Sequence, residues 1–71
     1  MSTQQTDTLP HISTEKEVAT YLRCTTAALR RWRRERRGPT WMKVGRLVRY
    51  RREDVIEYLN KTLQTSRYAG R

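Results

Sequence analysis

The sequence predicts a small, mainly α-helical domain with one β-hairpin, in the order helix, helix, hairpin, helix. Apolar residues recur at helical spacing in two short segments between residues 15 and 36, and again after residue 52. Between these segments, Gly38-Pro39 and Gly45 mark turns. A chain of 71 residues can bury only one small core, so we expect a single domain.

The first expected helix spans residues 15–22. Thr14 followed by Glu17 forms a capping box, in which each side chain accepts a hydrogen bond from the backbone N–H of the other residue. One third of the helix circumference carries the apolar side chains of Val18, Tyr21 and Leu22. The segment is therefore an amphipathic helix with one face turned to a core.

The second expected helix spans residues 26–36, with Thr25 as its N-cap and Gly38-Pro39 as its stop. An inner face suited to packing holds Ala28, Leu29 and Trp32. The opposite, outer face holds Thr26, Ala27, Arg30 and Arg34, with Arg31, Arg33 and Arg37 on its shoulders. Six arginines among the eight residues 30–37 repel one another unless phosphates neutralise them. This helix is therefore the best candidate for contact with a polyanion.

Two strand-like runs, residues 41–44 and 47–50, predict the hairpin. A two-residue turn at Gly45-Arg46 pairs Val44 with Leu47 and divides the apolar residues between the two faces. A three-residue loop over residues 45–47 leaves Lys43 and Arg49 on a basic face, and its apolar face gathers Met42, Val44, Val48 and Tyr50. Because burial of one face usually sets strand register, we expect the three-residue loop.

A third helix begins near Arg52, with acidic residues in its first turns, where they complement the helix dipole. It is expected to reach about Lys61 or slightly beyond, and one face carries Val55, Ile56, Leu59 and Leu63. The polar residues before the first helix show no period. We therefore expect a disordered N-terminal arm at 1–11, a folded domain at 12–63 and a flexible C-terminal tail at 64–71.

Basic residues concentrate in the middle of the chain. The whole chain carries a net charge of +9. Residues 23–52 hold eleven Arg and one Lys against Glu35 alone, a net of +11, whereas residues 1–22 carry −2 and residues 53–71 are neutral. Charge this concentrated is typical of a surface that binds a polyanion. Arginine also predominates over lysine, and its planar fork suits phosphate and guanine.

The composition argues against several other functions. Cys24 is the only cysteine and His11 the only histidine, so neither a disulfide nor a Cys/His metal site is expected. No histidine is placed beside a serine or cysteine, so we expect no catalytic residues, no cofactor and no small-molecule ligand. No apolar run approaches the roughly 18 residues of a membrane span, and the amino end lacks the order of a signal peptide. The expected location is the cytoplasm.

Two short helices, a hairpin and a covering helix are the layout of a winged helix-turn-helix domain. Such domains place the second helix in the major groove of double-stranded DNA. Outward residues of that helix then face base edges, and these are Thr26, Ala27, Arg30 and Arg34. The shoulder residues Arg31, Arg33 and Arg37 are expected at phosphates. The wing is expected to meet the minor groove with Lys43, Arg46 and Arg49.

Residues 12–59 resemble the excisionase-type, MerR-like winged-helix DNA-binding domains. The more specific part is the run GPTWMKVGRLVRYRREDVIEYL, which is similar to the wing and third helix of that family almost without interruption. Three positions depart from the family pattern: Arg23 replaces a common turn glycine, Ala28 a threonine and Leu47 an arginine. The resemblance implies DNA contacts at the matching positions Thr25, Thr26, Ala27, Arg30 and Arg46.

The resemblance also implies partners. Phage excisionases of this kind bind cooperatively at repeated sites, bend DNA and direct a phage integrase toward excision. A free-standing, arginine-rich domain looks most like an actinobacterial phage excisionase, which acts in the cytoplasm of the bacterial host. The alternative is a small transcriptional regulator of a phage or mobile element that uses the same surface. A third possibility is an arginine-rich segment that folds on RNA, and the capped, amphipathic helices argue against it.

Overall fold

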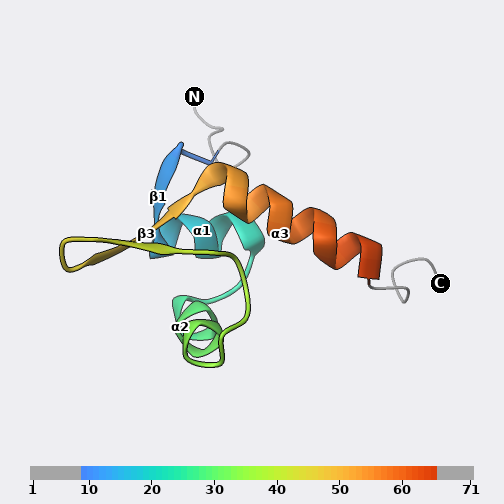
Figure 1. Cartoon of the computed structure of the whole chain (residues 1–71), viewed down its shortest axis with the longest axis horizontal. Coiled ribbons are helices and arrows are strands. Elements are labelled where there is room, and N and C mark those ends of the chain that lie inside the picture. The colour runs from blue at the N-terminus through green and yellow to red at the C-terminus, as the bar shows by residue number, and fades with distance from the viewer. Residues whose placement is uncertain (1–8, 66–71) are drawn as a thin grey trace.

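A computed structural model gives the fold of residues 9–65 (Figure 1). The elements follow in the order β1 (Ile12–Thr14), α1 (Glu15–Leu22), α2 (Thr26–Arg34), β2 (Met42–Val44), β3 (Leu47–Arg51) and α3 (Arg52–Thr65). Three helices with a small antiparallel sheet confirm the expected winged helix-turn-helix class. The sheet has three strands instead of the expected two, because β1 joins the hairpin.

The strand β1 pairs antiparallel with β3, which is the central strand in the order β1-β3-β2. Ile12 lies opposite Arg51 and Thr14 lies opposite Arg49. Ser13, between them, is fully buried, and its hydroxyl donates to the carbonyl of Pro10 at 2.7 Å, so the buried polar group is satisfied. A strand of three residues is too short to show a periodic pattern, and its partner lies far along the chain. The sequence pattern therefore missed it.

The hairpin has the two-residue turn, and the expected three-residue loop was wrong. Val44 pairs with Leu47, and the turn consists of Gly45, with a φ of 65°, and Arg46. A positive φ at the first central position alone is typical of a type II′ turn. Val44 and Leu47 are 50% and 52% exposed, because the tip projects beyond the core. Burial therefore does not set the strand register at this end of the hairpin.

The core contains six buried apolar side chains from the chain ahead of β1, both helices of the helix-turn-helix, β3 and α3: Leu9, Val18, Ala19, Leu29, Tyr50 and Val55. Leu9 was expected in the disordered arm, but it is 3% exposed, and Arg52 donates from Nη1 to its carbonyl at 3.1 Å. The folded part thus extends three residues ahead of the expected boundary. The rest of the expected arm, residues 1–8, and most of the expected tail, residues 66–71, lie outside the described residues.

The ends of α1 and the start of α2 follow the sequence prediction. The capping box is present: the Glu17 carboxylate accepts from the Thr14 N–H at 2.8 Å, and the Thr14 hydroxyl accepts from the Glu17 N–H at 3.1 Å. The Thr25 hydroxyl caps α2 by accepting from the Ala28 N–H at 3.0 Å. However, α2 ends at Arg34 instead of residue 36, because the chain turns into the left-handed region at Arg36.

The helix α3 is longer than expected and presents a different face to the core. Val55 is fully buried, whereas Ile56 and Leu63 are 38% and 66% exposed. The half-buried Tyr58 lies on the inner side, with its ring centroid 6.1 Å from that of Trp32 on α2. The expected apolar stripe was therefore wrong for Ile56 and Leu63 and omitted Tyr58.

Candidate nucleic-acid interface

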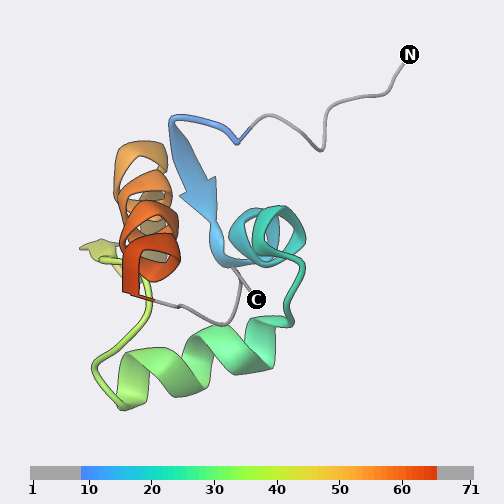
Figure 2. The same cartoon turned by 90° about the vertical axis from the view of Figure 1, so that its right-hand side faces the viewer.

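The helix α2 lies along one border of the molecule, with α1 and α3 both on its inner side (Figure 2). The inner face carries Leu29, which is fully buried, and Trp32, which packs against the core. The border is therefore formed by the opposite face of α2, the face that the sequence predicted for DNA.

The predicted base-contacting residues are mostly exposed. Ala27, Arg30 and Arg34 are exposed on the outer face of α2, and Thr26 is half-buried at its first position. Thr25 is exposed, and although its hydroxyl accepts the N-cap hydrogen bond, its O–H can still donate to a new partner. Assignment of these residues to bases stays a prediction.

One carboxylate on α1 binds two arginines of α2. Arg30 Nε lies 3.3 Å from both carboxylate oxygens of Glu15, and Arg33 Nη1 lies 2.9 Å from Glu15 Oε2. The Glu15 side chain is only 19% exposed, whereas Arg30 is 59% exposed. The pairing holds the Nε edge of the Arg30 guanidinium and leaves much of the side chain exposed to a ligand. The sequence placed Glu15 outside the apolar face of α1 and gave no sign of this contact.

Arg33 is bound inside the domain rather than free for a phosphate. Besides Glu15, its Nη1 donates to the Tyr50 hydroxyl at 3.0 Å, and its guanidinium lies 5.7 Å from the centre of the Trp41 ring. Burial lowers the pKa of Arg33, but the hydrogen bonds to Tyr50 and Glu15 outweigh that effect and raise its pKa. The guanidinium is therefore a permanently charged link between α2, α1 and β3. A phosphate contact for Arg33 has no support in this arrangement and stays an untested prediction.

The other two predicted phosphate contacts remain at the surface. Arg31 and Arg37 are both exposed. Arg37 pairs with Glu35 at 2.8 Å, and both side chains are open to solvent, so this exposed pair contributes little stability and is easily exchanged for a phosphate.

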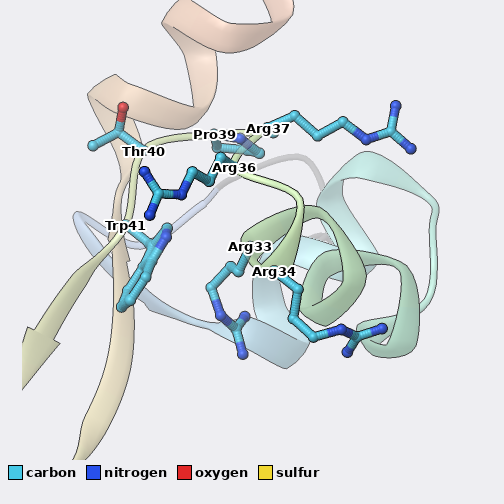
Figure 3. A pocket seen from close by; sticks show the side chains of 8 residues that line it. Arg33, Arg34, Arg36, Arg37, Pro39, Thr40 and Trp41 are labelled. Atoms are coloured by element: carbon cyan, nitrogen blue, oxygen red, sulfur yellow. The ribbon is translucent and has the colours of Figure 1, made fainter.

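An open groove of about 650 Å³ follows the end of α2 (Figure 3). The last turn of α2 and the segment before β2 line it with Arg33, Arg34, Arg36, Arg37, Gly38, Pro39, Thr40 and Trp41. Arg33 and Arg34 extend to the same side of the helix, while Arg36 and Arg37 extend in opposite directions (Figure 3). Four arginines line this groove, and because Glu15 pairs with Arg33 and Glu35 with Arg37, Arg34 and Arg36 are its arginines without a carboxylate partner among residues 9–65.

Gly38 determines how the chain enters this groove. Its φ is +89°, and a Cβ at this position would lie 3.0 Å from Cε3 and 3.1 Å from Cβ of Trp32. Only glycine combines this backbone conformation with so close an approach. The tryptophan that packs on the core thus also fixes the path of the segment leading to β2.

The wing carries its three predicted basic residues, but not on one face. Lys43 pairs with Val48, whereas Arg49 pairs with Met42, so the two cations lie on opposite faces and the expected common basic face was wrong. Lys43 is exposed, as is Arg46 at the tip. Arg49 is half-buried and donates from Nη1 to the Val48 carbonyl at 2.7 Å. Arg46 is therefore the best-placed wing residue for insertion into a groove.

Two exposed arginines of this surface were not among the predicted contacts. Arg23, in the turn between α1 and α2, and Arg36, after α2, both have the left-handed backbone conformation. Their positions next to helix ends were visible in the sequence, but their conformation was not.

Within residues 9–65, no group of three or more His, Cys, Asp and Glu side chains is arranged to hold a metal ion. Nor does any helix of this part of the chain have the length and apolarity to cross a membrane. The functional groups that cluster on the described surface are the arginines in and around α2.

A helix-turn-helix with an arginine-rich second helix and a basic wing defines a DNA-binding domain. The family model described as a helix-turn-helix domain matches residues 14–62, which is most of the chain. The chain therefore belongs to this helix-turn-helix family, and its partner class is DNA. No curated protein and no solved structure matches the chain.

Proposed function

We propose that this chain is an architectural DNA-binding protein that bends attachment-site DNA and directs a phage integrase toward prophage excision. The observation that carries the proposal is the charge on a small helix-turn-helix domain: residues 23–52 hold a net charge of +11. Neutralisation of many phosphates on one side of a duplex favours bending toward the protein, and bending is how a protein without catalytic groups can help a recombinase assemble.

The membership of a helix-turn-helix family supports the DNA-binding part of the proposal. The sequence resemblance to excisionases supports the recombination part. The proposed reading element is the outer face of α2, with Arg30 and Arg34 at guanines and Thr26 and Ala27 at thymine methyl groups. The proposed minor-groove contact is Arg46 at the tip of the wing.

The test begins with duplexes that the protein selects from a random pool, which supply its binding sequence. Circular-permutation electrophoresis then measures the bend, and a recombination assay with a phage integrase and its attachment-site DNA measures excision. A bend together with stimulated excision supports the proposal. Binding without a bend and without effect on excision contradicts it, and reporter transcription that responds to the protein identifies the alternative, a transcriptional regulator.

A pair of variants separates base reading from charge. Arg34→Ala is expected to cost about 1–3 kcal/mol on the selected duplex and to relax specificity at one base pair. Lys43→Ala is expected to weaken all sequences alike and to reduce the slope of log K against log salt by about one. If Arg34→Ala weakens every duplex equally, α2 lies in the groove with a different face.

A further inference from the structure

Both helices of the helix-turn-helix end in the same way, with an arginine in a conformation that favours glycine. At the end of α1, Arg23 has φ 59° and ψ 44°. The N–H of Cys24 donates to the Ala19 carbonyl at 2.9 Å, and the N–H of Arg23 donates to the Thr20 carbonyl at 3.2 Å. This pair of hydrogen bonds around a left-handed residue is the Schellman motif, in which glycine is the usual left-handed residue.

The end of α2 repeats the arrangement. Arg36 has a φ of 60°. The N–H of Arg37 donates to the Trp32 carbonyl at 2.8 Å, and the N–H of Arg36 donates to the Arg33 carbonyl at 3.2 Å. A residue with a Cβ is strained in the left-handed backbone conformation. The chain therefore carries an arginine at two positions where glycine is more stable.

Neither arginine gains a partner within the domain that offsets this strain. Both side chains are exposed, and among residues 9–65 no hydrogen bond or ion pair of either guanidinium is found. The neighbouring arginines differ: Arg30, Arg33 and Arg37 each bind a carboxylate. The backbone hydrogen bonds hold these turns, but no side-chain contact explains why an arginine occupies each position, and strain of this kind is often found at ligand contacts.

The positions of Arg23 and Arg36 indicate the ligand. Arg23 lies three residues before the first residue of α2, and Arg36 lies two residues after its last. A helix of nine residues is about 13 Å long, close to the roughly 12 Å width of the major groove. A helix of this length across the groove brings its two ends near the two phosphate backbones that border it.

We propose that Arg23 and Arg36 are phosphate anchors that hold the two ends of α2 on opposite backbones of the duplex. The proposal rests on the proposed DNA binding and adds two contacts to it. The hydrogen bonds of each Schellman motif fix the backbone position from which the arginine side chain extends, whereas a frayed helix end leaves that position variable. Because phosphates carry no sequence information, the anchors position α2 without specifying bases.

The test uses glycine variants, which are expected to raise stability and to weaken DNA binding. Arg23→Gly and Arg36→Gly relieve the strain and remove the cation, while Arg23→Ala and Arg36→Ala remove the cation and retain the strain. Each glycine variant is expected to melt at least about 4–8 °C above the alanine variant of the same position, measured by circular dichroism. Both variants of one position are expected to bind DNA equally weakly.

Binding is measured by fluorescence anisotropy on a 30-base-pair duplex of random sequence, at several salt concentrations. Each variant is expected to bind about 5- to 10-fold more weakly than the wild type, with the slope of log K against log salt reduced by about one. Lys61→Ala, which removes one cation from α3, is the charge control, and its slope is expected to match the wild type. Sequence preference, measured on the selected duplex, is expected to remain.

Glycine variants that bind with the affinity and salt slope of the wild type overturn the proposal, even if they are more stable. An equal loss for Lys61→Ala also overturns it, because the effect then comes from total charge. In both cases sequence-selective binding by the wild type leaves the proposed function intact. A wild type that binds no duplex removes the proposed function and the anchors together.

Discussion

Of the two glycines that the structure describes, Gly38 is the one whose replacement by alanine is expected to destabilise the domain more. The residue has a φ of +89°, which costs an L-amino acid about 1–2 kcal/mol. The added Cβ also meets Trp32 at 3.0 and 3.1 Å, closer than van der Waals contact. Overpacking of this kind typically costs about 1–3 kcal/mol.

The Trp32 contact cannot be relieved cheaply. One of the two close atoms is Cβ of Trp32, which moves only with the backbone of α2, and the ring itself packs against the core and against Tyr58. We therefore expect Gly38→Ala to lower the free energy of unfolding by about 2–5 kcal/mol. A domain of this size rarely has more than about 3–5 kcal/mol of stability, so most of it is lost.

Gly45→Ala is the matched control. Gly45 also has a positive φ, 65°, but an added Cβ there meets nothing within 4 Å. Its expected cost is the backbone part alone, about 1–2 kcal/mol. Urea titration followed by circular dichroism and by tryptophan fluorescence gives both values. If Gly38→Ala costs no more than Gly45→Ala, the contact with Trp32 does not limit the fold, and the reasoning is refuted.

Three further predictions concern the contacts beneath the interface. Glu15→Gln is expected to lower the free energy of unfolding by about 2 kcal/mol in urea titrations, because the partly buried guanidinium of Arg33 keeps its charge and loses its anion. A loss below about 0.5 kcal/mol contradicts this prediction. Burial raises the pKa of Tyr50, against the hydrogen bond from Arg33, which lowers it. The folded state therefore holds this proton more tightly, and the stability that it contributes is complete below the ordinary tyrosine pKa of about 10 and is lost as the pH rises above it. Unfolding curves of Tyr50→Phe are expected to show a smaller loss of stability above pH 10 than the wild type, and parallel pH profiles rule this out. Burial also raises the pKa of the Cys24 thiol, so alkylation by iodoacetamide near pH 8 is expected to be slower in the folded than in the urea-unfolded chain, and equal rates contradict it.

The sequence determined the local elements, because their signals are local. The capping box of Thr14 and Glu17, the cap at Thr25 and the helical spacing of apolar residues each depend on groups within four positions of one another. These signals suffice to place α1, the start of α2 and the start of α3. Net charge is a property of composition, so the location of the cationic segment was also evident without a structure.

Tertiary structure decided what depends on distant partners. The register of the wing follows the local turn at Gly45, and only the fold shows why: the tip lies beyond the core, so burial cannot choose between the two registers. Leu9 is buried and β1 exists because β3 and Arg52, some forty residues later, supply the partners. Neither partner can be identified from the spacing of residues near the amino end.

The candidate interface shows the same division. Its arginines were countable in the sequence, but which of them are available to DNA was not. Glu15 and Tyr50 hold Arg33 inside the domain, whereas Arg23 and Arg36 are exposed on the turns that end α1 and α2. An ion pair between helices and a left-handed backbone both arise from how the chain packs. Composition and periodicity therefore identify a cationic surface, and only the folded structure shows which of its arginines are exposed and available to DNA.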